Sequence, residues 1–323
     1  MKFDDLIGLK KPIVRLIEVL AAGIGRVAAP MILRKNADAQ AYELRTISEA
    51  IKDSREAIPD LHYEGGIISA TSPEYASTYS ERIESRVAYF EAKKQQNLES
   101  ISIIAAHRLD QEEDVPEESP TEEWISRFFS FAEDISSEEM KKLWGEVLAG
   151  EIKQPGSFSL RTLDALRNIS KEEAEIFVKV SRIVIRGAEI YAIPLIEDGR
   201  YLKSKFNINL RDILLLRELG LLFPTDLQFV LNSSDENPDI ALTCGNSCIW
   251  IRRPKDIPTT GINSVFLTSV GKQLLSLIEK EEADIEYIKK FTSYFRQENV
   301  KVLVGKLISD DGTNIQYENM KEI

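Results

Sequence analysis

Between residues 121 and 180, apolar side chains recur every three or four positions, and helix-capping residues stand at the breaks. WISRFFSFA and MKKLWGEVLAGEI each carry an apolar stripe along one helix face. The pairs Ser136 with Glu139 and Ser170 with Glu173 have the spacing of capping boxes, in which each side chain binds a backbone N–H group at a helix start. Because helix follows helix with little loop, this region predicts a compact all-α unit.

The stretch LWGEVLAGEIKQPGSFSLRTL raises the question of an active site. Glu151 lies seven residues after Trp144 and three after Leu148, which puts its carboxylate on or beside the apolar stripe. A buried carboxylate needs partners, and the backbone amides of PGSFS or the guanidinium of Arg161 are the nearby candidates. Glu146 falls on another face, so no second acid or base is at hand for catalysis. We predict a fixed corner between helices, formed by Trp144, Glu151, Pro155, Gly156, Ser159 and Arg161.

Residues 12–33 are apolar apart from Arg15, Glu18 and Arg26, and basic residues flank them. Three structures are compatible with this pattern: a helical hairpin packed on its own chain or a sister subunit, an interfacial membrane helix, and a constitutive span. The internal charges disfavour the span, Pro30 should end or kink a helix, and we favour the hairpin. The residues that would face a core, a sister subunit or a membrane surface are Ile13, Leu16, Ile17, Leu20, Ile24, Val27, Pro30 and Leu33.

The acidic residues are concentrated in one part of the chain. The formal charge is −12, and residues 109–139 hold twelve acidic residues against Arg127. Nucleic-acid partners are therefore unfavoured, because phosphate neutralisation needs clustered Lys and Arg. The run DQEEDVPEESPTEE is interpreted as a solvated linker that follows one long amphipathic helix over residues 80–110.

From Ile183 onward, strand-like runs such as DLQFVLN, IALTC, SCIWIRR and NSVFLTS follow a short helix, NLRDILLLRELGLL, and precede TSVGKQLLSLIEK. This order resembles a winged helix. The fold class expected is therefore α+β and predominantly α, an N-terminal helical bundle followed by a winged-helix-like module. We expect an N-terminal helical region at 1–112, a central all-α unit at 113–190, the winged-helix-like module at 191–281, and a C-terminal helix with a β-hairpin at 282–323.

The helix expected at 210–219 would be the DNA-reading helix of such a module. Its only bases, Arg211 and Arg217, are offset by Asp212 and Glu218. A DNA-reading helix usually has a basic, polar face. We therefore expect the C-terminal module to contact a protein partner in preference to nucleic acid.

No pattern for an enzyme, a metal or a cofactor is present. Cys244 and Cys248 flank the Gly-Asn tip of a predicted hairpin, and His62 and His107 lack metal-ligand spacing. There is no phosphate loop and no nucleophile elbow. We expect no cofactor and no catalytic residue, with a hydrolase or nuclease of dispersed carboxylates as a distant alternative. Two cysteines and no signal cleavage site indicate the cytoplasm, or the periphery of the inner membrane if residues 10–35 bind lipid.

Residues 97–180 resemble a bacterial family described as domain of unknown function 2806. The resemblance rests on NLESI, on WISRFFSFAEDISSEEMKKLWGEVLAGEIKQPGSFSLRTL and on NISKEEAEIF. More loosely, the layout is similar to that of abortive-infection alpha proteins, which implies bacterial defence against phage. The function expected is a non-enzymatic defence protein whose C-terminal module docks or senses a partner, while its N-terminal apolar helices act on membrane or assemble a homo-oligomer. A cytoplasmic scaffold or regulator with a protein- or DNA-binding module is the alternative.

Overall fold

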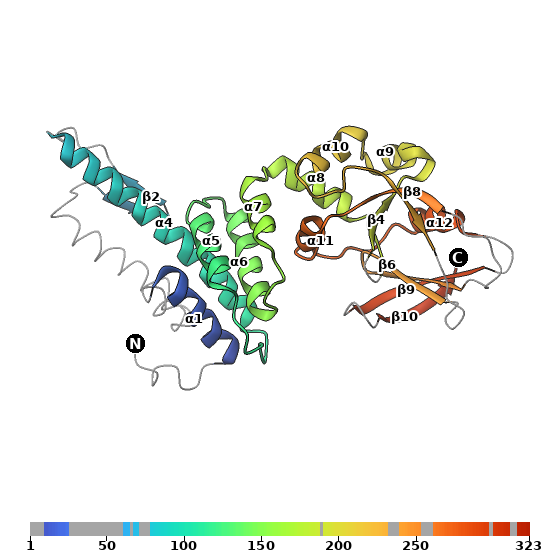
Figure 1. Cartoon of the computed structure of the whole chain (residues 1–323), viewed down its shortest axis with the longest axis horizontal. Helices are drawn as coiled ribbons and strands as arrows, with labels where there is room; N and C mark the ends of the chain where they lie inside the picture. Colours follow the sequence, from blue (N-terminus) through green and yellow to red (C-terminus); the bar gives the residue numbers. More distant parts are fainter. Residues whose placement is uncertain are drawn as a thin grey trace. The chain divides into compact units, whose positions relative to one another are not determined.

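The chain divides into two compact units, Met1–Leu163 and Asp164–Ile323 (Figure 1). The computed structural model describes residues 10–25, 61–64, 67–70, 78–187, 190–231, 239–252, 261–296, 300–310 and 315–323. Helical residues outnumber strand residues, so the expected α+β, predominantly helical class is confirmed. Val27, Pro30 and Leu33 lie outside the described residues.

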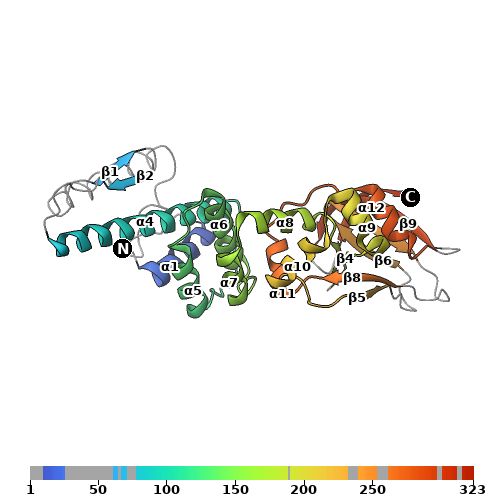
Figure 2. The same cartoon turned by 90° about the horizontal axis from the view of Figure 1, so that it is seen from above.

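Helices dominate the first unit. They are α1 (Lys11–Ile24), α4 (Tyr79–Leu109), α5 (Glu122–Ala132) and α6 (Glu138–Lys153), and α7 (Leu160–Asn168) crosses the boundary between the units. Strands β1 (Leu61–Glu64) and β2 (Ile67–Ala70) pair as an antiparallel hairpin, which Figure 2 shows beside the projecting half of α4. The long helix expected at 80–110 is confirmed. Its C-terminal half packs on α6, and α1 packs on α5, around the fully buried side chains of Leu16, Ile101, Phe128 and Trp144.

The acidic run before α5 is a bound loop and not a solvated linker. Lys11 forms an ion pair with Asp114 at 2.9 Å. Arg15 donates to the Ser119 hydroxyl and to the Glu117 carbonyl oxygen, each at 2.7 Å. The basic side of α1 thus neutralises part of the acidic excess, and the loop also buries Val115.

The helix starts follow the predicted capping chemistry with a one-residue correction. Ser170 and Glu173 form the expected capping box at α8 (Lys171–Ser181). At α6 the capping serine is Ser137 and not Ser136, because the Ser137 hydroxyl accepts from the N–H of Met140. Two adjacent serines offer the same side-chain chemistry, so only backbone geometry decides between them.

An eight-stranded antiparallel sheet organises the second unit, in the order β10-β9-β7-β6-β3-β4-β8-β5. The strands are β3 (Ile185–Arg186), β4 (Tyr191–Pro194), β5 (Leu227–Val230), β6 (Asp239–Cys244), β7 (Ser247–Arg252), β8 (Gly261–Phe266), β9 (Lys301–Asp310) and β10 (Ile315–Glu322). The other elements are α8, the 3-10 turn η2 (Ile196–Gly199), α9 (Arg200–Phe206), α10 (Leu210–Glu218), α11 (Ser269–Leu275) and α12 (Ile285–Ser293). The predicted hairpin with its tip at Gly245 and Asn246 is confirmed by the pairing of β6 with β7.

The division into units differs from the four expected segments. Helix α8, expected in the central all-α unit, belongs with the C-terminal unit. Its Lys179 ammonium contacts the Asp212 carboxylate of α10 at 3.0 Å and the carbonyl oxygen of Asn207 at 2.9 Å. These contacts span about thirty residues, which a local helical pattern does not reveal. Helix α9 was not expected.

Candidate functional site

The predicted corner after α6 is built around the Glu151 carboxylate. Glu151 is 2% exposed, and its two oxygens accept from the N–H groups of Gly156 at 2.7 Å and Phe158 at 2.8 Å. Gly156 has a φ of +86°, which turns the chain back toward the carboxylate. Burial raises the pKa of Glu151 above its ordinary value, and the two backbone N–H groups oppose that rise.

The surrounding residues close this corner. Trp124 donates its indole N–H to the Phe158 carbonyl oxygen at 2.7 Å, and the Ser159 hydroxyl accepts from the N–H of Thr162 at the start of α7. Trp144 is fully buried, whereas Arg161 is exposed. Of the two partners considered for Glu151, the backbone amides are therefore the ones observed. The arrangement fixes a turn.

The apolar stripe of α1 faces the interior of its own unit. Ile13, Leu16, Ile17 and Leu20 are each at most 6% exposed, and Ile24 is half-buried. Within the described residues, no helix is long and apolar enough to cross a membrane.

Helix α10 has one buried and one exposed side. Its N-cap is Asn209, whose side chain accepts from the N–H groups of Arg211 and Asp212, as the sequence predicted. Asp212, Ile213 and Leu216 are buried, while Leu210 is 70% exposed and Leu214 is 51% exposed. Leucines four positions apart on a helix lie on the same side. Helix α10 therefore presents two leucines to solvent along one line.

The segment after α10 carries two more exposed apolar side chains. Gly220, at a φ of +71°, ends the helix, and Phe223 and Leu227 follow with 44% and 51% exposure. The Arg217 side chain donates to the Phe223 carbonyl oxygen at 3.1 Å and pairs with Asp226, which ties this segment to the last turn of α10. We call Leu210, Leu214, Phe223 and Leu227 the α10 face. Sequence reasoning considered only the charges of this helix and missed the apolar residues, although the i, i+4 leucines were a usable signal.

Charges lie along the border of the α10 face. Arg211 and Glu218 are both exposed and lie seven residues apart, two helical turns along the same side. Arg217 is already neutralised by Asp226. The face therefore has apolar side chains at its centre, one base near the start of the helix and one acid near its end.

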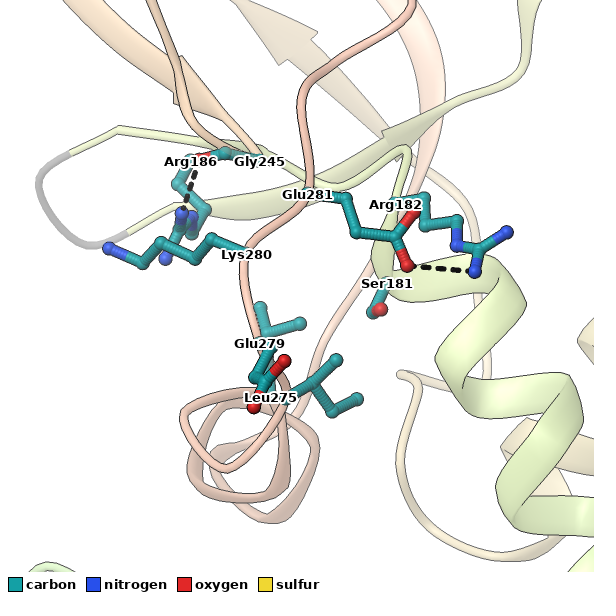
Figure 3. Close-up of a pocket in the computed structure, with 9 residues that line it drawn as sticks. Ser181, Arg182, Arg186, Gly245, Leu275, Glu279, Lys280 and Glu281 are labelled. Atoms are coloured by element: carbon teal, nitrogen blue, oxygen red, sulfur yellow. Dashed lines mark hydrogen bonds and ion pairs between the residues drawn. The ribbon is translucent and has the colours of Figure 1, made fainter. Parts of the chain in front are cut away.

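A small pocket in the same unit lies under the β6–β7 turn (Figure 3). Arg182 pairs with Glu281 at 2.8 Å, and Arg186 donates to the Gly245 carbonyl oxygen at 3.2 Å. The Asn246 side chain donates to the Lys280 carbonyl oxygen at 2.6 Å. The backbone N–H of Asn246 donates to the Glu281 carbonyl oxygen. The two contacts drawn in Figure 3 join residues 279–281 to Arg182, and the β6–β7 turn to Arg186. This pocket is a junction that fastens the hairpin turn to residues 279–281.

Glycine is required at this junction. A Cβ on Gly245 would lie 2.1 Å from the Glu281 carbonyl oxygen, and the backbone φ is +50°. Both cysteines of the hairpin are buried and form no disulfide with each other, and burial raises the pKa of the Cys244 thiol to about 12. A thiol held protonated in this way is a poor nucleophile and a poor metal ligand. In the described parts of the chain, no group of three His, Cys, Asp or Glu side chains could hold a metal ion.

Comparison with known families identifies the chain. The model of the family described as "Protein of unknown function (DUF2806)" matches residues 81–292, about two thirds of the sequence, and the chain belongs to this family. Searches of curated proteins and of solved structures gave no match. The resemblance seen in the sequence is therefore confirmed for this family, and the match includes α10 and Glu151.

Proposed function

We propose that this chain is a non-enzymatic interaction protein whose C-terminal unit contacts another protein through the α10 face. One observation carries the proposal: four large apolar side chains, between 44% and 70% exposed, are gathered on one helix and the segment that follows it. Exposed apolar side chains that are grouped in this way mark interaction surfaces, whereas single ones need no explanation.

We propose that the elements around α10 form a winged-helix-like module, as the order of helices and strands suggested. Along the chain, the elements of a winged helix are a helix, a strand, two helices and two strands. In its sheet, the last strand lies between the other two. Here α8, β4, α9, α10, β5 and β8 follow in that chain order, and the sheet order contains β4-β8-β5. The β6–β7 hairpin is inserted between β5 and β8. The two-residue strand β3 lies between α8 and β4. In such a module α10 would take the position of the helix that contacts the partner.

The chemistry of α10 favours a protein over DNA. Asp226 neutralises Arg217, and Asp212 faces Lys179 inside the unit. Arg211 is the remaining base of α10, and the exposed Glu218 opposes it. DNA recognition needs Lys or Arg side chains facing the phosphates and polar side chains facing the edges of the nucleobases. Leucines contribute little to either contact. An apolar helix side on a protein partner would instead bury Leu210 and Leu214.

A photo-crosslinking amino acid placed at Leu214 of the full chain in cells tests this function. We expect a protein adduct from position 214 and none from Ile285, a 45% exposed residue on α12 that serves as the matched control. A nucleic-acid adduct at 214 would support the DNA-binding regulator instead. Equal labelling at both positions, or none at 214, would contradict the proposal.

We also propose that the helices of the N-terminal unit pack as a bundle within their own chain, and that the whole serves bacterial defence. The burial of Leu16 and Leu20 within the unit supports packing over lipid contact. Plaque counts on cells that carry the full chain or Leu214→Glu test the defence role, and co-sedimentation with anionic vesicles tests membrane contact. Unchanged plaque counts with the full chain would remove defence from the proposal. Vesicle binding would give the N-terminal helices a membrane role in place of internal packing.

A further inference from the structure

We infer that the α10 face binds the α10 face of a second copy of this chain, with the two helices antiparallel across a two-fold axis near Leu214. The inference rests on the proposed function, since it names the partner on that surface. It follows from where the exposed side chains stand along α10, because a two-fold interface requires a surface complementary to itself.

The apolar side chains of the α10 face satisfy this requirement. Leu210 stands at the start of α10 and Leu214 near its middle, while Phe223 lies five residues past its end, where the Arg217 side chain of the last turn donates to its carbonyl oxygen. In an antiparallel pair, the start of one helix lies beside the end of the other. Leu214 then packs on Leu214 of the partner subunit, and Leu210 packs on the partner's Phe223. Three of the four side chains of the α10 face, all except Leu227, thus meet an apolar side chain of the partner.

The charges at the border match the same arrangement. Arg211 and Glu218 lie on one side of α10 at nearly equal distances from Leu214. An antiparallel pair places Arg211 beside the partner's Glu218, and Glu218 beside the partner's Arg211, which gives two equivalent ion pairs. A parallel pair, with its two-fold axis along the helices, would put the two copies of Arg211 on opposite sides of the contact and would form neither ion pair. Arg217 does not disturb either arrangement, because Asp226 neutralises it within the same chain.

The size of the surface sets the expected strength. Helix α10 has nine residues and is about 14 Å long. A contact based on one short helix falls below the area of a standard stable interface, so the dimer should be weak and concentration-dependent. The structure thus predicts a monomer in dilute solution that dimerises as its concentration rises.

Engineered disulfides test the geometry directly. The native cysteines are both fully buried, so they do not compete. Disulfides form only where Cα atoms come within about 7 Å. Leu214→Cys should give a covalent dimer under mild oxidation, whereas Leu210→Cys alone should not. A mixture of Leu210→Cys and Phe223→Cys should give the crossed dimer. Ile285→Cys, equally exposed but on α12, is the control.

A charge exchange tests the ion pairs in the chain without added cysteine. Arg211→Glu should weaken self-association in sedimentation equilibrium by about tenfold, because two attractive pairs become repulsive. The exchanged double variant Arg211→Glu/Glu218→Arg should restore it. Restoration would not follow if Arg211 acted only within its own helix.

The outcomes separate the inference from the function on which it rests. Leu214→Cys dimers with charge-dependent association support the inference. Dimers no more abundant than with Ile285→Cys, and a full chain that stays monomeric at high concentration, would overturn it. If the photo-crosslinker at 214 then captures a different protein, the proposed function stands without the homodimer. If it captures nothing, both are wrong.

Discussion

The Glu151 corner buries a charged side chain, whereas the α10 face exposes apolar ones. At the corner a carboxylate is almost completely buried, and two backbone N–H groups from the next five to seven residues satisfy it. At the α10 face, four apolar side chains stand in solvent, and the described parts of the chain leave them uncovered. Each region reverses the usual preference of its side chains for water or for the core.

The two regions differ in whether contacts within the chain compensate for the unusual burial or exposure. The buried charge at Glu151 is explained by its own turn, so no ligand or substrate is needed to justify it. The exposed leucines of α10 have no such compensation, which makes them the better candidate for function. The changes below, ordered from the largest expected effect on stability to the smallest, test this contrast.

The first change tests whether the unit that carries α10 is as tightly fixed as the corner. Gly245→Ala should lower the free energy of unfolding by about 3 kcal/mol or more, because its Cβ would meet the Glu281 carbonyl oxygen. Urea unfolding followed by fluorescence measures the loss. Gly199→Ala is the control: it has a φ of +81° but open space, so only backbone strain should appear, on the order of 1 kcal/mol. Equal losses would show that the junction is not tight.

Removing the carboxylate tests the corner itself. Glu151→Ala leaves the N–H groups of Gly156 and Phe158 without their acceptor, the second of them buried, and should cost about 2 to 3 kcal/mol of unfolding free energy. Glu139→Ala, an exposed acid in the first turn of α6, should change it by less than about 0.5 kcal/mol. If the two variants unfold at the same urea concentration, the corner is not a structural element.

The pH dependence of the corner should be small and of definite sign. Burial raises the pKa of Glu151 in the folded state above its ordinary value, so the folded chain binds this proton more tightly than the unfolded chain. The contribution of Glu151 to stability therefore grows as pH falls through the folded pKa, and it levels off below the unfolded one. The stability of the natural chain minus that of Glu151→Gln should be larger at about pH 5 than at neutral pH. A difference that shrinks on acidification would contradict the raised pKa.

The smallest effect on stability is expected at the α10 face. Leu214→Glu should change the free energy of unfolding by less than about 0.5 kcal/mol, because the side chain is half exposed. Its buried neighbour gives the contrast, since Leu216→Ala should cost about 3 kcal/mol. A thermal melt of both variants decides the matter. A large loss from Leu214→Glu would show that Leu214 is a core residue and remove the contrast between the two regions.

The predictable parts of the fold depend on neighbouring residues. The capping box of Ser170 with Glu173, the Asn209 cap and the tight turn at Gly245 each involve groups at most four positions apart. The helix spacing of the central region and the two C-terminal hairpins were also read from the sequence. At Glu151 the sequence predicted burial and named the correct backbone partners beside an incorrect one.

The parts that were not predicted depend on distant pairings. Strand β3, only two residues long, joins the sheet by pairing with β6 almost sixty residues later, and β7 pairs with β9 over a similar interval. A local sequence pattern does not indicate which distant strand a given strand pairs with. The acidic loop gave no sign that the basic residues of α1, about a hundred residues earlier, bind it. The i, i+4 spacing of Leu210 and Leu214 shows that they share one side of a helix, but their exposure is known only once the neighbouring elements are placed.

The contacts of α1 carry a consequence for biosynthesis. This helix leaves the ribosome long before its partners exist, since Lys10 and Arg15 bind residues 100 to 104 positions later. At translation speeds of about 5 to 20 residues per second, its apolar stripe waits some 5 to 20 seconds for the segments that will cover it. During that interval the nascent chain presents a basic amphipathic segment to chaperones, to targeting factors and to the surfaces around the ribosome.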